Sequence, residues 1–374
     1  MLRSIRLGHI LGISLEVDYT WFIVFALVAA ALATGYFPAA LPAERFPIVL
    51  LLAVVTALAL FASVVAHELA HSYVARLNGV NITSITLFVF GGVARMTDEP
   101  PSPGAELRIA AAGPAMSIFL AAAFGSVYVW GQALQWPQEL QTAFKLLAGM
   151  NIMLAIFNLL PGFPLDGGRL LRALLWKKTG SLGQATRVAS GAGQLLGYAL
   201  IVWGALDILG GSLVGGIWLI FIGWFVIQAA VASYRQVQAR QMLSGIPVRS
   251  LMTTDVVTVP AHITLKELVE NYFLAHGYTA YPVLDGENLV GCVSLDKVRA
   301  IEREKWPTLI VGDIVPPLSD RHVVSPETDG WDAVAKMARE GQPRLLVTEG
   351  DRLVGMLSQT NVMRLIRARL ELGV

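Results

Sequence analysis

Long apolar runs, each bounded by polar or turn-forming residues, fill the first two-thirds of this chain. A helix needs about 20 apolar residues to cross a bilayer, and six runs have about this length. They lie at residues 19–37, 49–76, 107–132, 143–160, 185–209 and 213–233. The pattern therefore predicts a multi-span α-helical membrane protein with six transmembrane helices.

Two stretches outside these runs have the character of β-strands. Residues 1–18 alternate charged with apolar positions, which predicts a short amphipathic strand or hairpin. Residues 78–103 are rich in Val, Ile, Thr and Phe, and Gly91, Gly92 and three prolines interrupt them. Since β-branched and aromatic residues favour strands, we expect a small membrane-associated β-sheet here.

Charged residues become more than twice as dense after Tyr234. Residues 1–234 carry 12 Lys and Arg with 10 Asp and Glu, and the last 140 residues carry 16 and 17. We therefore place a membrane domain at 1–234, a linker at 235–246 and a soluble α/β region at 247–374. The net charge of +1 argues against a nucleic-acid partner, because no densely basic face is present.

The second apolar run contains the sequence HELAH at residues 67–71. Ionisable groups are costly inside a membrane and usually serve a function there. His67 and His71 are one helical turn apart, so both imidazoles can bind one Zn²⁺. Glu68 can take a proton from a zinc-bound water. This spacing is the H-E-x-x-H pattern of zinc peptidases.

A catalytic zinc usually has three protein ligands, so a third must be found. The other histidines lie near the N-terminus or in the polar C-terminal region, at His9, His262, His276 and His322. A carboxylate is therefore expected, and Asp166 is the best candidate. It follows an apolar run where prolines and glycines break the helix, and broken backbone at membrane depth is buried in protein or lines a wet cavity. The alternative is an aspartate that merely ends a helix at the interface.

HELAH in a membrane helix, followed about a hundred residues later by PLDGGR, resembles the site-2 protease family of intramembrane zinc metalloproteases. The resemblance covers roughly residues 1–235. It implies that His67, His71 and Asp166 bind one Zn²⁺ per chain and that Glu68 is the catalytic base. The chain would then hydrolyse peptide bonds of a transmembrane protein substrate, such as a membrane-anchored regulator, in regulated intramembrane proteolysis within the lipid bilayer.

Other positions resemble the same family. Phe90, Gly91 and Gly92 are similar to its glycine-containing strand beside the active site, and with Val93 this strand is expected to bind unwound substrate by β-addition. Gly113-Pro114 resembles its Gly-Pro motif. The family often has Asn where this chain has Ser117, which leaves open whether that helix gives the site a polar group.

Asn158, eight residues before Asp166, is a candidate donor to the developing oxyanion. The alternative is a polar residue satisfied between helices. Gly193/Gly197 and Gly211/Gly215 have the spacing that permits close helix contact. We expect them to pack within one chain rather than to dimerise it.

The soluble region contains a repeat, since residues 289–294 (LVGCVS) match residues 353–358 (LVGMLS). Each copy, at about 247–306 and 307–370, reads strand, helix, strand, strand, helix. The pair resembles tandem cystathionine β-synthase (CBS) domains, which implies homodimer formation and an adenine nucleotide. In that family a Ser/Thr is followed three residues later by an Asp that holds the ribose hydroxyls of the nucleotide. Here Lys297 takes that position after Ser294, and Asn361 takes it after Ser358. Nucleotide contacts are assigned to Ser294, Ser358 and Asn361, with a structural or dimerising module as the alternative.

Lysine and arginine lie in excess on one set of loops, so both termini are predicted to be cytoplasmic, in a bacterial or archaeal cell membrane. A CBS-regulated metal-ion channel or transporter is the alternative function, in which the histidines would bind a transported metal. Two observations favour the protease. Glu68 has the position of the base in the H-E-x-x-H pattern, and no inverted repeat is visible among the six runs.

Overall fold

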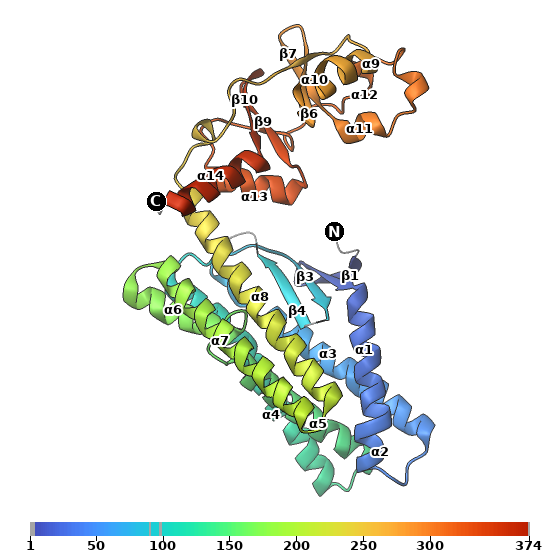
Figure 1. The fold of residues 1–374 in the computed structure, drawn as a ribbon. Coiled ribbons are helices and arrows are strands. Elements are labelled where there is room, and N and C mark those ends of the chain that lie inside the picture. The colour runs from blue at the N-terminus through green and yellow to red at the C-terminus, as the bar shows by residue number, and fades with distance from the viewer. Residues whose placement is uncertain (1–3, 90, 97–98, 373–374) are drawn as a thin grey trace. The chain divides into compact units, whose positions relative to one another are not determined.

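The computed structural model describes residues 4–89, 91–96 and 99–372 (Figure 1). The chain divides into two compact units, Met1–Arg235 and Gln236–Val374.

The first unit contains the predicted apolar helices, and the six-span prediction is confirmed. Among the described residues, six helical stretches are long and apolar enough to cross a membrane. They are Tyr19–Ala40, Phe46–Leu77 (α3), Pro103–Ala133 (α4), Gln138–Asn158 (α5), Leu182–Leu209 (α7) and Leu213–Leu243 (α8). The first consists of α1 (Tyr19–Ala31), a π-helical turn (Leu32–Tyr36) and α2 (Phe37–Ala40).

The helix starts have local causes in the sequence. The side chain of Asp18 accepts a hydrogen bond from the Thr20 backbone N–H at the start of α1, and Ser102 and Ser181 cap α4 and α7 in the same way. A further helix, α6 (Asp166–Thr179), lies in the basic stretch where no span was predicted. It ends at Gly180, which adopts the left-handed conformation with φ of 70°.

The predicted small sheet is present, and within the described part of the chain it has four strands, in the order β1 (Ser4–Ile10), β2 (Ile13–Asp18), β3 (Ile82–Phe88) and β4 (Gly91–Met96). β2 and β3 are parallel and the other pairs are antiparallel. The two strand-like stretches of the sequence are therefore joined in one sheet. Arg76 of α3 donates to the backbone oxygens of Leu11 and Gly12, which fixes the turn of the first hairpin against α3.

The second unit consists of two copies of one fold, each with a three-stranded sheet. The first copy contains β5 (Val259–Pro260), α9 (Leu265–Leu268), a π-helical turn (Val269–Phe273), α10 (Leu274–His276), β6 (Ala280–Asp285), β7 (Asn288–Ser294) and α11 (Leu295–Arg299). The second contains β8 (Val323–Val324), α13 (Gly330–Glu340), β9 (Arg344–Glu349), β10 (Arg352–Ser358) and α14 (Gln359–Leu372). Three short helices, Val248–Ser250, Arg303–Lys305 and α12 (Val311–Ile314), lie in the connections. The predicted order of strands and helices is confirmed in both copies.

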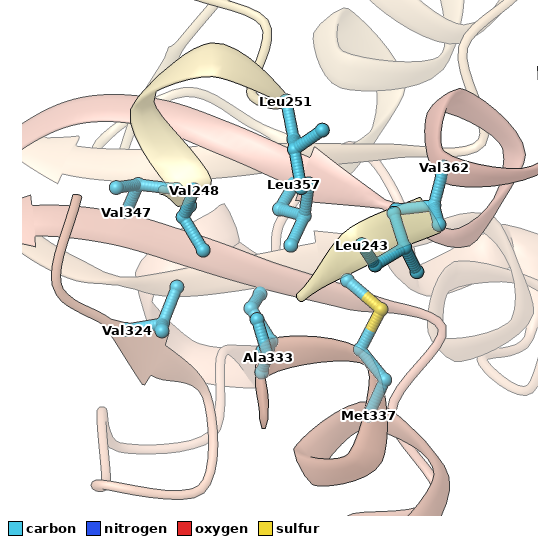
Figure 2. Packing of buried hydrophobic residues seen from close by; sticks show 10 residues of the cluster. Leu243, Val248, Leu251, Val324, Ala333, Met337, Val347, Leu357 and Val362 are labelled. Atoms are coloured by element: carbon cyan, nitrogen blue, oxygen red, sulfur yellow. The ribbon is translucent and has the colours of Figure 1, made fainter. Parts of the chain in front are cut away.

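The core of the second copy includes residues that lie before β5 in the sequence. Leu243, Val248 and Leu251 pack with Val347 and Leu357 of the second sheet (Figure 2). The stretch 235–246, expected as a linker, is helical as far as Leu243. Its apolar residues therefore belong to a folded core rather than to a free tether.

Candidate metal centre and active site

Three potential metal ligands from two helices converge at one point. His67 and His71 lie one turn apart on α3, and Asp166 is the first residue of α6. The Oδ2 atom of Asp166 lies 3.1 Å from Nε2 of His67 and 3.0 Å from Nε2 of His71, and the two Nε2 atoms are 3.2 Å apart. All three residues are buried. The structure thus brings together the three residues that the sequence singled out.

Helix α4 orients both imidazoles from behind. Nδ1 of His71 lies 2.6 Å from the backbone oxygen of Ile109, and Nδ1 of His67 lies 2.9 Å from Oγ of Ser117. A carbonyl oxygen only accepts, so the His71 ring must donate from Nδ1. Its Nε2 atom then carries a lone pair when the ring is neutral, and this lone pair faces the centre.

The donor set and the space at this centre fit a zinc ion. In a tetrahedral site with bonds of about 2.0–2.1 Å, two ligand atoms lie roughly 3.3 Å apart, close to the separations found here. Gly113 of α4 keeps the space open. A Cβ atom at Gly113 would lie 2.1 Å from Nε2 of His71 and 2.5 Å from Nε2 of His67. Two imidazoles and a carboxylate are the ligand types of catalytic zinc.

Glu68, the candidate base, follows His67 on α3 and packs against Gly92 of β4. A Cβ atom at Gly92 of β4 would lie 2.5 Å from Cγ of Glu68 and 3.3 Å from its Oε1. β4 is the last strand in the sheet order, so one of its edges has no partner strand among the described residues. Gly91 and Val93 lie on the same strand, and Phe90 lies outside the described residues. Three of the four predicted substrate-binding positions therefore lie on a strand that passes the candidate base.

The loop between α5 and α6 positions Asp166, which directly follows it, at the metal centre. Leu165 N–H donates to the Gly162 carbonyl at 3.0 Å and closes a tight turn just before Asp166. Asn158 is the last residue of α5, and its amide donates to the Leu154 carbonyl at 3.0 Å. In this structure the Asn158 amide therefore bonds within its own helix, and its oxyanion role stays a prediction.

Comparisons with known proteins agree with this geometry. Residues 55–135 and 125–202 match the family described as Peptidase family M50, and residues 248–303 and 311–368 match the CBS domain. A relative from Mycobacterium tuberculosis named "Putative zinc metalloprotease Rip3" is 37% identical over 98% of this chain and 93% of its own length. The chain belongs to peptidase family M50.

Two further M50-related matches come from Methanocaldococcus jannaschii. Zinc metalloprotease MJ0392 is 34% identical over 96% of this chain and 95% of its own length. A solved structure titled Site-2 Protease is 35% identical, covers 62% of this chain and 96% of its own, and has a TM-score of 0.44. The family match and the full-length relatives confirm the family resemblance that the two sequence motifs indicated.

In this M50 peptidase, a buried ion pair near the site was missed by sequence reasoning. Nε of Arg172 in α6 donates to Oε1 of Glu106 in α4 at 2.6 Å, and the Glu106 side chain is fully buried. The Arg172 guanidinium also lies 5.0 Å from the ring centre of Phe163. The sequence does show Glu106 as an acidic residue in the first turn of a membrane helix. Its partner Arg172 is 66 positions away, so no local pattern links the two residues. The pair ties α4, which orients the histidines, to α6, which carries Asp166.

Ser117 is the second contributor that the sequence left open. It is fully buried, and its hydroxyl contacts His67. Helix α4 therefore does give the site a polar side chain, at the position where the family often has Asn.

The predicted nucleotide contacts fall in two places in the second unit. Ser294 lines a cavity of about 340 Å³ between the two CBS copies, together with Cys292, Lys297, His322 and Arg344. Ser358 and Asn361 are not among the described residues that line this cavity. The Asn361 N–H donates to Oγ of Ser358 at 3.2 Å, and the Asn361 amide donates to Oγ1 of Thr253 at 2.6 Å.

Proposed function

We propose that this M50 peptidase is an intramembrane zinc metalloprotease that hydrolyses peptide bonds of transmembrane protein substrates. The observation that carries the proposal is the convergence of the buried His67, His71 and Asp166 beside Glu68 of the apolar helix α3. His67, His71 and Asp166 would hold the metal, and Glu68 would be the base. A zinc ion bound there would lower the pKa of a water ligand to about 7 and polarise the scissile carbonyl.

The side chains of the chain itself move and hold the protons. Glu68 takes a proton from the attacking water and passes it to the leaving amine. Its position against Gly92 restricts the carboxylate to one side of the site. Ser117 and the Ile109 carbonyl keep the imidazoles turned toward the centre. Asn158 turns from the Leu154 carbonyl to the negative charge that develops on the substrate oxygen.

Substrate binds along β4. A transmembrane helix must unwind before its carbonyls can be attacked, and unwound backbone needs hydrogen-bond partners in an apolar setting. The open edge of β4 offers them by strand addition, at Gly91, Gly92 and Val93. Phe90 would extend the same strand. A membrane-anchored regulator is the kind of substrate we expect.

The protein is a multi-pass membrane protein, and we assign both termini to the cytoplasmic side of a bacterial or archaeal cell membrane. The support is the excess of Lys and Arg on the loops of that side. The basic residues of α6, Arg169, Arg172, Lys177 and Lys178, belong to this excess.

The CBS pair regulates the protease, and an adenine nucleotide in the cavity beside Ser294 is the proposed signal. Lys297 and Arg344 line this cavity with the single carboxylate of Asp296, so its charged lining is net positive and favours an anionic ligand. Ser358 and Asn361 are proposed contacts for a nucleotide bound to the second copy. The pair also provides the surface for a homodimer. A nucleotide can shift the activity only by its different affinity for two states of the enzyme.

The proposed activity is tested with Glu68→Gln and Asp166→Ala in the full-length protein. Glu68→Gln should retain zinc and lose cleavage of a model transmembrane substrate, because an amide fills the space but cannot accept the proton. Asp166→Ala should lower the zinc content of the purified protein. Cleavage by Glu68→Gln at the wild-type rate would refute the proposal, and metal transport unaffected by this change would favour the channel or transporter.

Regulation is tested by adding AMP or ATP to the full-length enzyme. The cleavage rate of a fixed substrate should change, and Lys297→Ala should weaken the response. A rate that ignores both nucleotides would assign the CBS pair to dimerisation or to docking of another protein.

A further inference from the structure

The loop that carries Asp166 rests directly on the backbone of α7. A Cβ atom at Gly193 of α7 would lie 1.9 Å from the carbonyl oxygen of Phe163, and a Cβ atom at Gly162 would lie 2.6 Å from Cα of Gly193. Real Cβ atoms do not approach other atoms so closely. The close approach of loop and helix therefore requires glycine at both positions.

A hydrogen bond and apolar packing hold the loop at this place. Phe163 N–H donates to the Ala189 carbonyl of α7 at 3.1 Å. The Phe163 ring packs in a small cluster with Ala189, with Ala230 of α8 and with Leu171 of α6. Ala189 and Ala230 are fully buried. Phe163 is thus fixed to α7 by its backbone and to α8 by its side chain.

The short segment from Gly162 to Asp166 has little freedom to absorb a displacement. Leu165 N–H donates to the Gly162 carbonyl at 3.0 Å, and Gly168 N–H donates to the Leu165 carbonyl at 3.0 Å. A Cβ atom at Gly168 would lie 2.3 Å from the carbonyl carbon of Gly162, so the first turn of α6 packs on the loop itself. A shift at Gly162 or Phe163 must therefore move Asp166.

We infer that Gly193 is a positioning residue for the metal centre. Because glycine has no side chain, the Asp166 loop can lie directly on α7, and this close approach sets the position of the third ligand. This inference rests on the proposed zinc-dependent function, because Asp166 is a proposed ligand. Helix α7 carries none of the predicted ligands, yet it would determine whether the two imidazoles and the carboxylate meet within 3.0–3.2 Å.

The test is Gly193→Ala in full-length protein purified in detergent, with two matched controls on α7. A Cβ atom at Gly191 meets no described atom within 4 Å, so Gly191→Ala makes the same change without a clash. A Cβ atom at Gly197 would lie 2.5 Å from Ile227 and 2.7 Å from the Gly223 carbonyl, so Gly197→Ala makes a comparable clash with α8 and not with the loop. Zinc affinity is measured by competition with a chelator, and the visible spectrum of the Co²⁺-substituted protein reports the geometry of the ligands.

Gly193→Ala should weaken zinc binding by about 10- to 100-fold, the range for groups that orient metal ligands, and should alter the Co²⁺ spectrum. Gly191→Ala should match the wild type, and Gly197→Ala should lower thermal stability with a smaller effect on zinc. Unchanged zinc binding and spectrum in Gly193→Ala, or equal losses in Gly193→Ala and Gly197→Ala, would overturn the inference.

Phe163→Ala serves if Gly193→Ala does not yield folded protein, since it frees the loop from its cluster without adding bulk. It should also weaken zinc binding, and unchanged affinity would overturn the inference. Wild-type protein that binds no zinc would instead refute the proposed function, so the two failures are distinguishable.

Discussion

Nδ1 of His71 donates to the backbone carbonyl of Ile109 over 2.6 Å. A backbone acceptor cannot be removed by substituting a side chain, so this contact fixes the ring of one candidate ligand through the fold of α4. The other imidazole depends on a side chain, because Nδ1 of His67 contacts the Ser117 hydroxyl. The two histidines of one motif are thus held by different kinds of acceptor or donor group. Only the contact of His67 with Ser117 can be removed by substituting the partner's side chain.

Ser117→Ala should weaken zinc binding without unfolding the protein. The hydroxyl contact at 2.9 Å holds the orientation of the His67 ring, and loss of such an orienting partner typically lowers metal affinity by about 10- to 100-fold. Chelator competition on the purified protein measures the effect. Ser72→Ala is the matched control, since Ser72 is fully buried on the same helix as His67 and its hydroxyl has no partner among the described residues. Equal zinc affinities for the wild type and Ser117→Ala would remove Ser117 from the site.

Gly92→Ala should retain zinc and lose most of the proteolytic activity. A methyl group on β4 would press on Cγ of Glu68 at 2.5 Å and displace the base. A displacement of about 1 Å in a catalytic group can cost roughly 100-fold in rate. Steady-state cleavage and zinc content are measured on the same preparation. Gly8→Ala on β1 is the control, because its Cβ would meet no described atom within 4 Å. Full activity in Gly92→Ala would show that Glu68 can act from another position.

The membrane helices and the three candidate ligands could be proposed from the sequence because their signals are local. An apolar run of about 20 residues determines a span by itself, and His67 and His71 share one helical turn. Helix α6 was missed, since it is a basic amphipathic helix with few consecutive apolar residues. Asp166 could be proposed from composition and from the broken backbone before it, but its distance to the histidines could not.

Contacts between distant segments lay beyond the sequence pattern. The parallel pairing of β2 with β3 joins residues 14–17 to 84–87, and no local signal specifies it.

The G-x-x-x-G spacing of the glycine pairs predicted contacts within the chain only in part. The prediction that Gly197 packs within the chain is confirmed, because it meets Gly223 of α8. The prediction for Gly211 is wrong, since Gly211 lies with φ of +95° in the turn between α7 and α8.

Arg172→Met should destabilise the membrane domain because it leaves Glu106 buried without its partner. Removal of one member of a buried ion pair costs about 3–5 kcal/mol, whereas replacement of both by apolar residues is often nearly neutral. The double variant Arg172→Met with Glu106→Leu should therefore recover most of the loss. Unfolding midpoints in mixed micelles for both single variants and the double variant give the coupling energy. Additive losses in the double variant would contradict a specific pair.

Cys292 should react slowly with a thiol reagent and more slowly still when nucleotide is bound. It is the only cysteine of the chain and lines the cavity beside Ser294. Burial raises the pKa of the Cys292 thiol. Because the thiolate is the reactive form, less of it is present near pH 8 than in a free cysteine, and the labelling rate should rise by about tenfold per pH unit up to the raised pKa. The same chain in denaturant gives the reference rate.

AMP or ATP in the cavity should cover the Cys292 sulfur and slow labelling at constant pH. Lys297→Ala should label no faster than the wild type in the absence of nucleotide, because burial still raises the pKa of Cys292 and the nearby Lys297 charge that lowers this pKa is gone. It should lose the protection by nucleotide, because the ligand's phosphates lose a cation. Labelling as fast as in denaturant would refute the burial of the thiol. Slow labelling that neither nucleotide changes would show that AMP and ATP do not bind in the cavity beside Ser294 of this M50 peptidase.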